Sequence, residues 1–303
     1  MSFGRACFGD NQFLGIHHGD PDKAARLERR FAQTDAILAL LDCAHQAGVR
    51  DFIFTTHDRY DPVFAEILRS NLFAGMRYSP CLPYAHKYAN AMAERGMVRV
   101  VAQALAKVNP ARLPGALIGA AMGRYRGVMQ LLVGLEIHAC KGLPLNGVFL
   151  QNVLFDLMLA MDLPGLIGDF DRFVTRRLGA VPGYITMNHA LAVQFLCDGA
   201  GLQRPWIAAN LNLAGFRTHP SRDAVAASFA SGRSRNLAMS AFAGEAPAGA
   251  LDFVLACKGV DGVLFGSSKP ENIRVNTARI LAATAGETAT FETAACETSA
   301  WEA

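Results

Sequence analysis

The chain has 303 residues, of which 51% are hydrophobic and 18% charged, so it can bury a large core and whole-chain disorder is excluded. Its 29 basic and 26 acidic residues give a net charge of +3, and the scattered charges do not suit a nucleic-acid-binding face. We therefore expect a small-molecule partner and no nucleic acid.

The N-terminal sequence predicts a cytoplasmic protein. MSFGRACFGDNQF lacks the basic region and the continuous apolar region of a secretion signal. The seven cysteines form no CxxC pair and are odd in number, which favours reduced thiols. The longest apolar segment, 113–139, is interrupted by Arg124 and Arg126, so no transmembrane helix is expected.

Short apolar runs alternate along the chain with segments of helical period, which is typical of strand–helix units around a parallel sheet. The eight runs lie at 6–16, 51–56, 73–79, 147–152, 183–188, 206–213, 236–242 and 261–268. Eight such repeats predict an α/β fold, a closed (β/α)8 TIM barrel that forms one domain over residues 1–283. After residue 283 the apolar periodicity is lost, so 284–303 are predicted to be a mobile tail.

The segments between the runs carry the start and stop signals of helices. TDAILALLDCAHQAGV begins at Thr34 and stops at Gly48, directly before the second run, and Gly259 stops a later helix in the same way. The exception is 84–144, which is far longer than one helix requires and contains breaks at Pro110 and Pro114. It predicts a helical insertion between strands three and four.

The apolar part of this insertion, 113–139, must be covered by something. We expect it to pack on the barrel wall or against a second subunit in a homodimer. The functional alternative is a lid over the barrel mouth or a peripheral membrane contact, in which Arg124 or Arg126 meets an anionic group.

In such barrels the active site lies at the carboxyl ends of the strands, and here those ends are rich in amides, hydroxyls and imidazoles. One such residue can simply cap a helix, but this many at one mouth predict a polar binding site. The candidates for substrate binding are Asn11, Gln12, His17, Gln151, Asn152, His189 and Asn212.

No metal site is expected, although eight histidines are present. The neighbouring His17 and His18 would point to opposite sides of an extended segment, and the last run closes in serines instead of an aspartate.

The sequence FGSSKPENIRVN, which follows the last run, favours an anion site. Glycine permits close backbone approach, Ser267 and Ser268 offer hydroxyls, and the next helix offers free N–H groups. The alternative is a serine that caps this helix with nothing bound.

The segment ALDFVLACKGVDGVLFGSSKPENIRVN resembles the C-terminal end of the aldo-keto reductases, where these elements bind the adenosine phosphate of NADP. The resemblance runs from about Thr34 to Ala282 and is closest in roughly the last forty of these residues. It places the catalytic tyrosine of the family at Tyr60, after the second strand, and the asparagine that holds the nicotinamide carboxamide at Asn188. The cofactor-binding candidates are Asn188, Asn210, Ser240, Gly266, Ser267, Ser268, Asn272 and Asn276.

The chain departs from the family at its proton relay. Thr55 stands at the position of the catalytic aspartate, no lysine closes the run 73–79, and Gln151 or Asn152 replaces the histidine of strand four. Arg77 cannot replace the lysine, because a guanidinium does not lose its proton at ordinary pH.

Three functions remain open. The favoured one is a divergent NADP-dependent oxidoreductase for a small carbonyl or alcohol, in which Tyr60 or His57 donates the proton. The second is a cofactor-independent lyase, isomerase or transferase for a phosphorylated or polar small molecule, with His57 and Asp58 as acid and base. The third is a non-catalytic binding barrel. The oxidoreductase ranks first because the match after the last strand is the most specific signal in the sequence.

Overall fold

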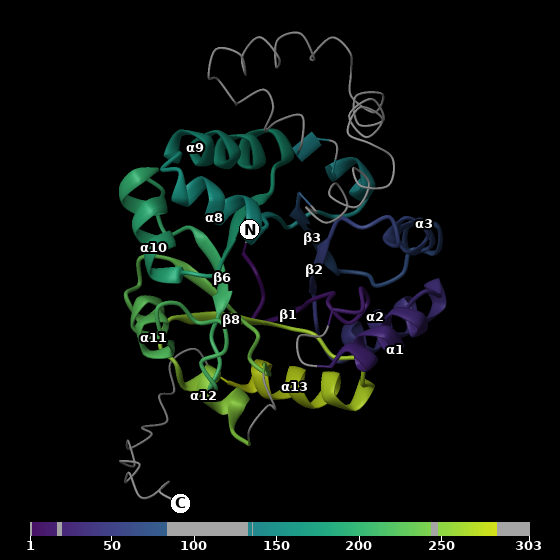
Figure 1. The fold of residues 1–303 in the computed structure, drawn as a ribbon. Helices are drawn as coiled ribbons and strands as arrows, with labels where there is room; N and C mark the ends of the chain where they lie inside the picture. Colours follow the sequence, from purple (N-terminus) through teal and green to yellow (C-terminus); the bar gives the residue numbers. More distant parts are fainter. Residues whose placement is uncertain (1, 17–19, 84–132, 135, 244–247, 284–303) are drawn as a thin grey trace, which may run out of the picture.

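Eight parallel strands close into a barrel, and helices surround it (Figure 1). The computed structural model describes residues 2–16, 20–83, 133–134, 136–243 and 248–283. His17, the tail 284–303 and residues 84–132 of the predicted insertion lie outside these residues. The strands are β1 (Ala6–Phe8), β2 (Asp51–Thr55), β3 (Arg77–Leu82), β4 (Gly147–Leu150), β5 (Val181–Thr186), β6 (Trp206–Asn210), β7 (Arg235–Met239) and β8 (Val260–Phe265).

Each strand pairs in parallel with the next, and the ring closes where β1 pairs with β8, with Cys7 opposite Leu264. The prediction of a (β/α)8 barrel is confirmed. The described helices are α1 (Pro21–Arg30), α2 (Thr34–Gln46), α3 (Tyr60–Ser70), α8 (Asn152–Ala160), α9 (Pro164–Phe173), α10 (His189–Gln194), α11 (Arg222–Ala230), α12 (Ala250–Ala256) and α13 (Pro270–Ala282). Short helical turns are η2 (His138–Cys140), η3 (Val174–Leu178) and η4 (Phe195–Gly199).

Local sequence explains where the helices begin and end. The Asp20 side chain caps α1 by accepting the Lys23 N–H at 2.8 Å, and Pro21 follows at the first helical position. Gly48, which the sequence marked as a helix stop, lies two residues after the end of α2 and has a φ of +104°. None of the described helices is long and apolar enough to cross a membrane.

Apolar side chains fill both the barrel and the layer around it. Inside the barrel the Phe3 ring lies 5.1 Å from the Phe149 ring and 5.0 Å from the Trp206 ring, so the N-terminal segment closes the lower end of the barrel. Outside it, the aromatic rings of β1, β2 and α3 pack together. The inward and outward alternation of each strand separates these two cores.

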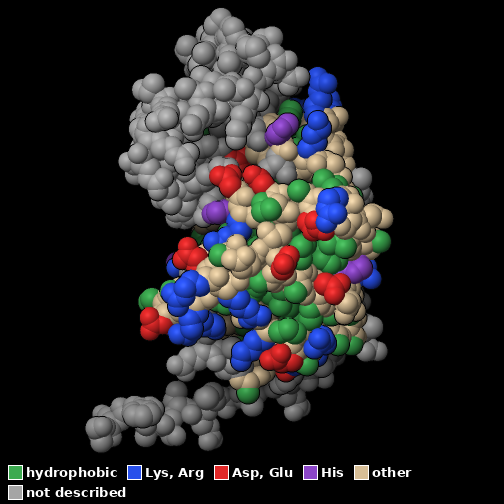
Figure 2. Space-filling model, turned by 90° about the vertical axis from the view of Figure 1, so that its right-hand side faces the viewer, with side chains coloured by type: hydrophobic (Ala, Val, Ile, Leu, Met, Phe, Trp, Pro, Cys, Tyr) green, Lys and Arg blue, Asp and Glu red, His purple; other side chains and the backbone are tan. Residues whose placement is uncertain are grey.

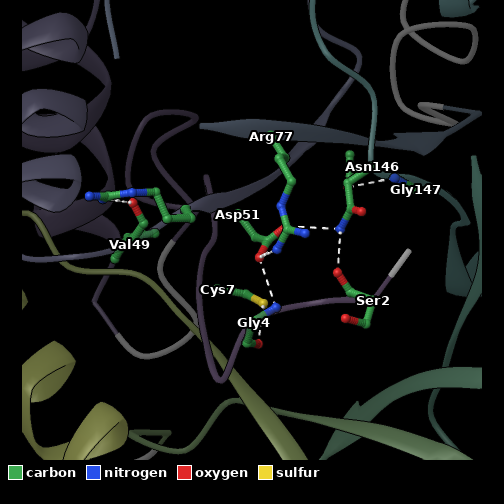
Figure 3. A network of polar contacts seen from close by, with 10 residues as sticks. Ser2, Gly4, Cys7, Val49, Asp51, Arg77, Asn146 and Gly147 are labelled. Atoms are coloured by element: carbon green, nitrogen blue, oxygen red, sulfur yellow. Dashed lines mark hydrogen bonds and ion pairs between the residues drawn. The ribbon is translucent and has the colours of Figure 1, made fainter. Parts of the chain in front are cut away.

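A polar network lies beside Phe3, at the amino ends of the strands (Figure 3). Asp51 is fully buried and accepts the Gly4 N–H at 2.8 Å and the Asn146 side-chain amide at 2.9 Å, and it pairs with Arg77. Asn146 also donates to the Ser2 carbonyl at 3.1 Å. The network therefore ties the N-terminal segment to β2 and β3.

The predicted position of strand three is wrong. The run 73–79 is centred too early, because residues 73–76 form a turn in which the Met76 N–H donates to the Phe73 carbonyl at 2.9 Å. Phe73 and Gly75 both have positive φ. The strand continues instead through Pro80 and ends at Leu82, three residues beyond the predicted run. Lys87, the next lysine along the chain, lies outside the described residues.

Candidate functional site

The carboxyl ends of the strands form one rim, because all eight strands are parallel. Ile185, Met239 and Leu264 belong to the core inside the barrel, yet they are only partly buried. They lie in the half of their strands that ends at this rim. We call this end of the barrel the mouth.

Asp10 lies on the mouth at the end of β1 and is 6% exposed. Its Oδ2 atom accepts the Thr55 N–H at 2.7 Å and the Tyr60 hydroxyl at 3.1 Å. Burial raises the pKa of Asp10 to about 6, against the lowering effect of these hydrogen bonds. This carboxyl group is therefore in a position to exchange a proton near neutral pH.

Tyr60, the predicted proton donor, begins α3 and is 1% exposed. Its ring packs against Phe54 at 5.6 Å and stacks on Phe64 at 5.5 Å, in the layer between β2 and α3. The hydroxyl points toward Asp10 from outside the barrel wall. Tyr60 and the mouth are thus connected through Asp10.

The other residues that follow β2 differ in exposure. The half-buried His57 uses its Nδ1 atom to accept the Arg59 N–H at 3.0 Å, and Asp58 is exposed. Thr56 is buried and donates its hydroxyl to Glu136, a buried residue from the segment before β4. A second carboxylate therefore reaches the end of β2 from a distant part of the chain.

The opposite side of the mouth presents amide and hydroxyl groups. The Ser240 hydroxyl donates to the Asn210 side-chain oxygen at 2.7 Å, and the Asn210 amide donates to the Arg217 carbonyl at 3.0 Å. Its neighbour Met187 lies at the end of β5, where its sulfur is 3.5 Å from that amide. Asp156 of α8 holds this end of β5 by accepting the Met187 N–H at 3.1 Å.

The turn between β8 and α13 lies on the same rim. The Ser267 hydroxyl accepts the Lys269 N–H at 3.2 Å, and Arg30 at the end of α1 donates to the Ser268 carbonyl at 2.9 Å. The backbone of Gly266 lies close to Gln12, since a Cβ atom at Gly266 would lie 2.2 Å from the Gln12 side-chain oxygen and that side chain would have to shift. The turn thus combines serine hydroxyls with the guanidinium group of Arg30, and Lys269 contributes its backbone N–H.

Lys and Arg side chains also gather in the lower part of the face shown in Figure 2, which is the side of the molecule that carries α1. Helix α1 itself contains Lys23, Arg26, Arg29 and Arg30. This positive surface lies next to the turn, since Arg30 contacts it directly.

Several candidate residues already have partners within the protein. His189 is fully buried outside the barrel wall, with Nδ1 2.8 Å from the Ser228 hydroxyl and Nε2 2.8 Å from the Asn236 side-chain oxygen. Asn188 caps α10 by accepting the Leu191 N–H at 3.2 Å. Asn212 is buried and uses both ends of its amide on the backbone of Phe216.

The remaining candidates lie at the rim or on helices. Gln12 is buried and donates to the Gly9 carbonyl at 2.7 Å, whereas Asn11 is exposed. Gln151 and Asn152 are half-buried at the start of α8, and Asn272 and Asn276 lie on α13. Within the described ranges no three His, Cys, Asp or Glu residues cluster as a metal site would require.

The comparisons with known proteins concern the fold. No protein-family model matches the chain, and no curated protein matches its sequence. A structure of a Pseudomonas aeruginosa protein proposed to be an aldo-keto reductase superimposes with a TM-score of 0.58 at 11% identity, over 93% of this chain and 92% of that one. The chain has an aldo-keto reductase-like barrel.

Two further structures agree. A second structure of a Pseudomonas aeruginosa protein with the same proposed assignment gives a TM-score of 0.57 at 11% identity, over 93% of this chain and 91% of that one. An aldo-keto reductase from Klebsiella pneumoniae in complex with NADPH gives 0.52 at 11% identity, over 92% of this chain and 86% of that one. The low identity fits a divergent barrel.

The sequence did not point to three of the groups at the mouth. Asp10 falls inside the apolar run 6–16, which predicts one strand, although β1 ends at Phe8. A polar residue after Gly9 was the available signal. Nothing in the sequence links Glu136 to β2 or Arg30 to the turn after β8, because each contact joins residues far apart in the chain.

Proposed function

We propose that this protein is an oxidoreductase that binds NADP(H) at the mouth and acts on a small carbonyl or alcohol substrate. The observation that carries the proposal is the turn after β8, where Arg30 and Lys269 flank Ser267 and Ser268 at the start of α13. Hydroxyls, helix N–H groups and fixed cations are the donors that bind a phosphate. The NADPH complex of the Klebsiella pneumoniae reductase, with the same type of barrel, supports this choice of ligand.

The other side of the mouth suits the nicotinamide end of the cofactor. The amide of a carboxamide is a donor, and the side-chain oxygens of Asn210 and Ser240 can each accept a further hydrogen bond, while their own donors are used on Arg217, Met187 and Asn210. Ile185, Met239 and Leu264 provide partly exposed apolar surface in the barrel below for an aromatic ring. When bound, NADPH would supply a hydride to a substrate carbonyl.

The first experiment compares ligands by thermal shift. NADPH at saturating concentration is expected to raise the melting temperature of the full chain, because a ligand that binds only the folded state stabilises it. NADH and inorganic phosphate are expected to give much smaller shifts, since NADH lacks the additional phosphate and phosphate lacks the nicotinamide. Equal shifts with NADPH and NADH would contradict selection by the cationic turn.

The contact of Arg30 with the turn is tested by a matched pair of variants. Arg30→Ala should weaken NADPH binding by about 10-fold, the effect of losing one charge-assisted contact. Arg29→Ala removes the same charge from the same exposed helix end, without the side-chain bond to Ser268, and should change binding much less. Equal losses would mean that only the overall charge matters.

A cofactor-independent lyase, isomerase or transferase is the second candidate, and the observation that favours it is the buried carboxyl of Asp10 beside the hydroxyl of Tyr60. Such a pair can act as acid and base without a cofactor. Stabilisation by inorganic phosphate without any further effect of NADPH would favour this function over the first.

A further inference from the structure

We propose that Asp10 is the proton donor of the site and that Tyr60 is a positioning residue that holds its carboxyl group. The inference deepens the proposed function and rests on it. It replaces the expectation, taken from the family resemblance, that Tyr60 itself gives the proton.

The position of Asp10 is the first step of the argument. The Gly9 N–H donates to the Phe265 carbonyl at 2.8 Å and is the last backbone bond between β1 and β8. Asp10 follows directly and thus stands on the rim where barrels of this class hold their chemistry. Its carboxyl accepts the Thr55 N–H, and Thr55 lies opposite Cys81 of β3, a residue of the core inside the barrel, so the carboxyl lies near the inner wall.

The hydrogen bonds of Asp10 are the second step. The Thr55 N–H and the Tyr60 hydroxyl both bind Oδ2 and fix the orientation of the carboxyl group. A carboxyl group held in one orientation loses little freedom when it transfers a proton. Tyr60 uses its own hydroxyl proton in this contact and is more deeply buried than Asp10.

The surroundings of Asp10 are the third step. Among the described residues, the titratable groups that interact with it are Tyr60 of α3 and Cys81 of β3. Burial and the nearby carboxylate raise the pKa of the Cys81 thiol well above its usual range, so this thiol stays neutral. In the described part of the chain no neighbouring charge accounts for the pKa of Asp10, which burial raises to about 6.

The proton step balances as follows for carbonyl reduction. The O–H bond of the protonated Asp10 carboxyl breaks, and a new O–H bond forms on the substrate oxygen. Bound NADPH would supply the hydride: a C–H bond of its nicotinamide ring would break to leave NADP⁺, a new C–H bond would form at the carbonyl carbon, and the electron pair of the C=O π bond would move to the oxygen that takes the proton. Asp10 is left as a carboxylate and regains its proton from water.

The experiment follows the Asp10 carboxyl directly by NMR of the full chain labelled with ¹³C at aspartate carboxyls. One resonance should titrate near pH 6 and be absent in Asp10→Asn. With NADP⁺ bound, its midpoint should lie about one pH unit below that with NADPH, because only the oxidised nicotinamide ring is positively charged. Equal midpoints with the two cofactor forms would place Asp10 away from the reacting ring and overturn the proposal.

Variants supply an independent readout. With NADPH and 4-nitrobenzaldehyde as the probe, Asp10→Asn should lower kcat/KM by about 100-fold or more, while the Kd for NADPH stays within about twofold. Tyr60→Phe should move the pH inflection of the rate upward, since it removes a hydrogen bond that favours the carboxylate. Asp198→Asn, at an exposed ion pair with Arg233, serves as the control and should change neither kcat/KM nor the pH inflection of the rate.

The outcomes separate the two levels of the argument. If NADPH fails to stabilise the wild-type chain, the proposed function is wrong. If NADPH binds but Asp10→Asn keeps the wild-type rate and pH profile, the role of Asp10 is wrong and the proposed function stands. If Asp10→Asn does not fold, the pH profile of Tyr60→Phe is the test. A rate inflection at the same pH as in the wild type would overturn the inference.

Discussion

Replacing Asp51 with asparagine would remove a charge from the bottom of the barrel while keeping the size of the side chain. Asp51 is fully buried and accepts hydrogen bonds from Gly4, Arg77 and Asn146 (Figure 3). An asparagine can accept only with one end, so its amide would face the amide of Asn146. Either that contact is lost or Asn146 turns over and gives up its bond to Ser2.

The size of the effect follows from these contacts. With asparagine, the acceptor of the Gly4 and Arg77 hydrogen bonds is uncharged, which weakens each bond by roughly 1 kcal/mol. The bond from Asn146, or the bond from Asn146 to Ser2, is lost as well, at about 1 kcal/mol. The Arg77 side chain is 36% exposed, so water screens part of its pairing and the upper limit for a buried pair does not apply. The expected loss is about 3 kcal/mol in the free energy of unfolding.

Urea unfolding followed by far-UV circular dichroism measures this loss, provided that the slope with urea is unchanged. The matched control is Asp198→Asn, which removes the same charge from an exposed pair with Arg233 and should cost no more than about 0.5 kcal/mol. If Asp51→Asn cost no more than this control, the network would not stabilise the fold and the reasoning would fail.

Three further predictions concern pH and packing. Burial lowers the pKa of His189 to about 4, below its unfolded value, so the unfolded state binds the proton first and stability falls as the pH drops. From pH 7 to 5 the wild type should lose about 2 kcal/mol more than His189→Gln in urea titrations. Burial raises the pKa of Asp10 to about 6, above its unfolded value, so the folded state binds this proton more tightly than the unfolded state. The free energy of unfolding should therefore fall by about 2 kcal/mol as the pH rises from about 4.5 to about 7.5. Asp10→Asn should not show this fall. Gly259→Ala should lower the free energy of unfolding by more than about 3 kcal/mol, because the new Cβ would lie 2.0 Å from the Phe229 carbonyl oxygen. Gly232 has a similar positive φ with open space around it, so Gly232→Ala should cost only about 1 kcal/mol. Similar losses for the two glycine variants would refute the steric argument.

The sequence was sufficient for the number and order of strands, because βα alternation repeats in its apolar pattern. Strand boundaries were less accessible. Pro80 is an unfavourable residue in most strands, yet it lies inside β3 opposite Phe54. Pairing with neighbouring strands set the ends of β3, and this information lies in other parts of the chain.

The composition of the mouth could be predicted only in part, since a residue near a strand end can face the opening or the helix layer. His189 follows β5 closely, but as the first residue of α10 it turns toward Ser228 and Asn236. Ser267 and Ser268, by contrast, lie in a turn on the expected rim. The direction in which α10 begins decides where the His189 side chain points, and the sequence pattern does not predict that direction.

The pairing of β1 with β8 has a consequence for synthesis on the ribosome. Cys7 is among the first residues made, and its partner Leu264 is among the last of the barrel. One edge of β1 therefore has no partner until nearly the whole barrel has emerged, and contacts of such high sequence separation form slowly. The bond between the Gly4 N–H and Asp51 is available much earlier, because it needs only β1 and β2. It can hold β1 in place on the nascent chain until β8 has been made.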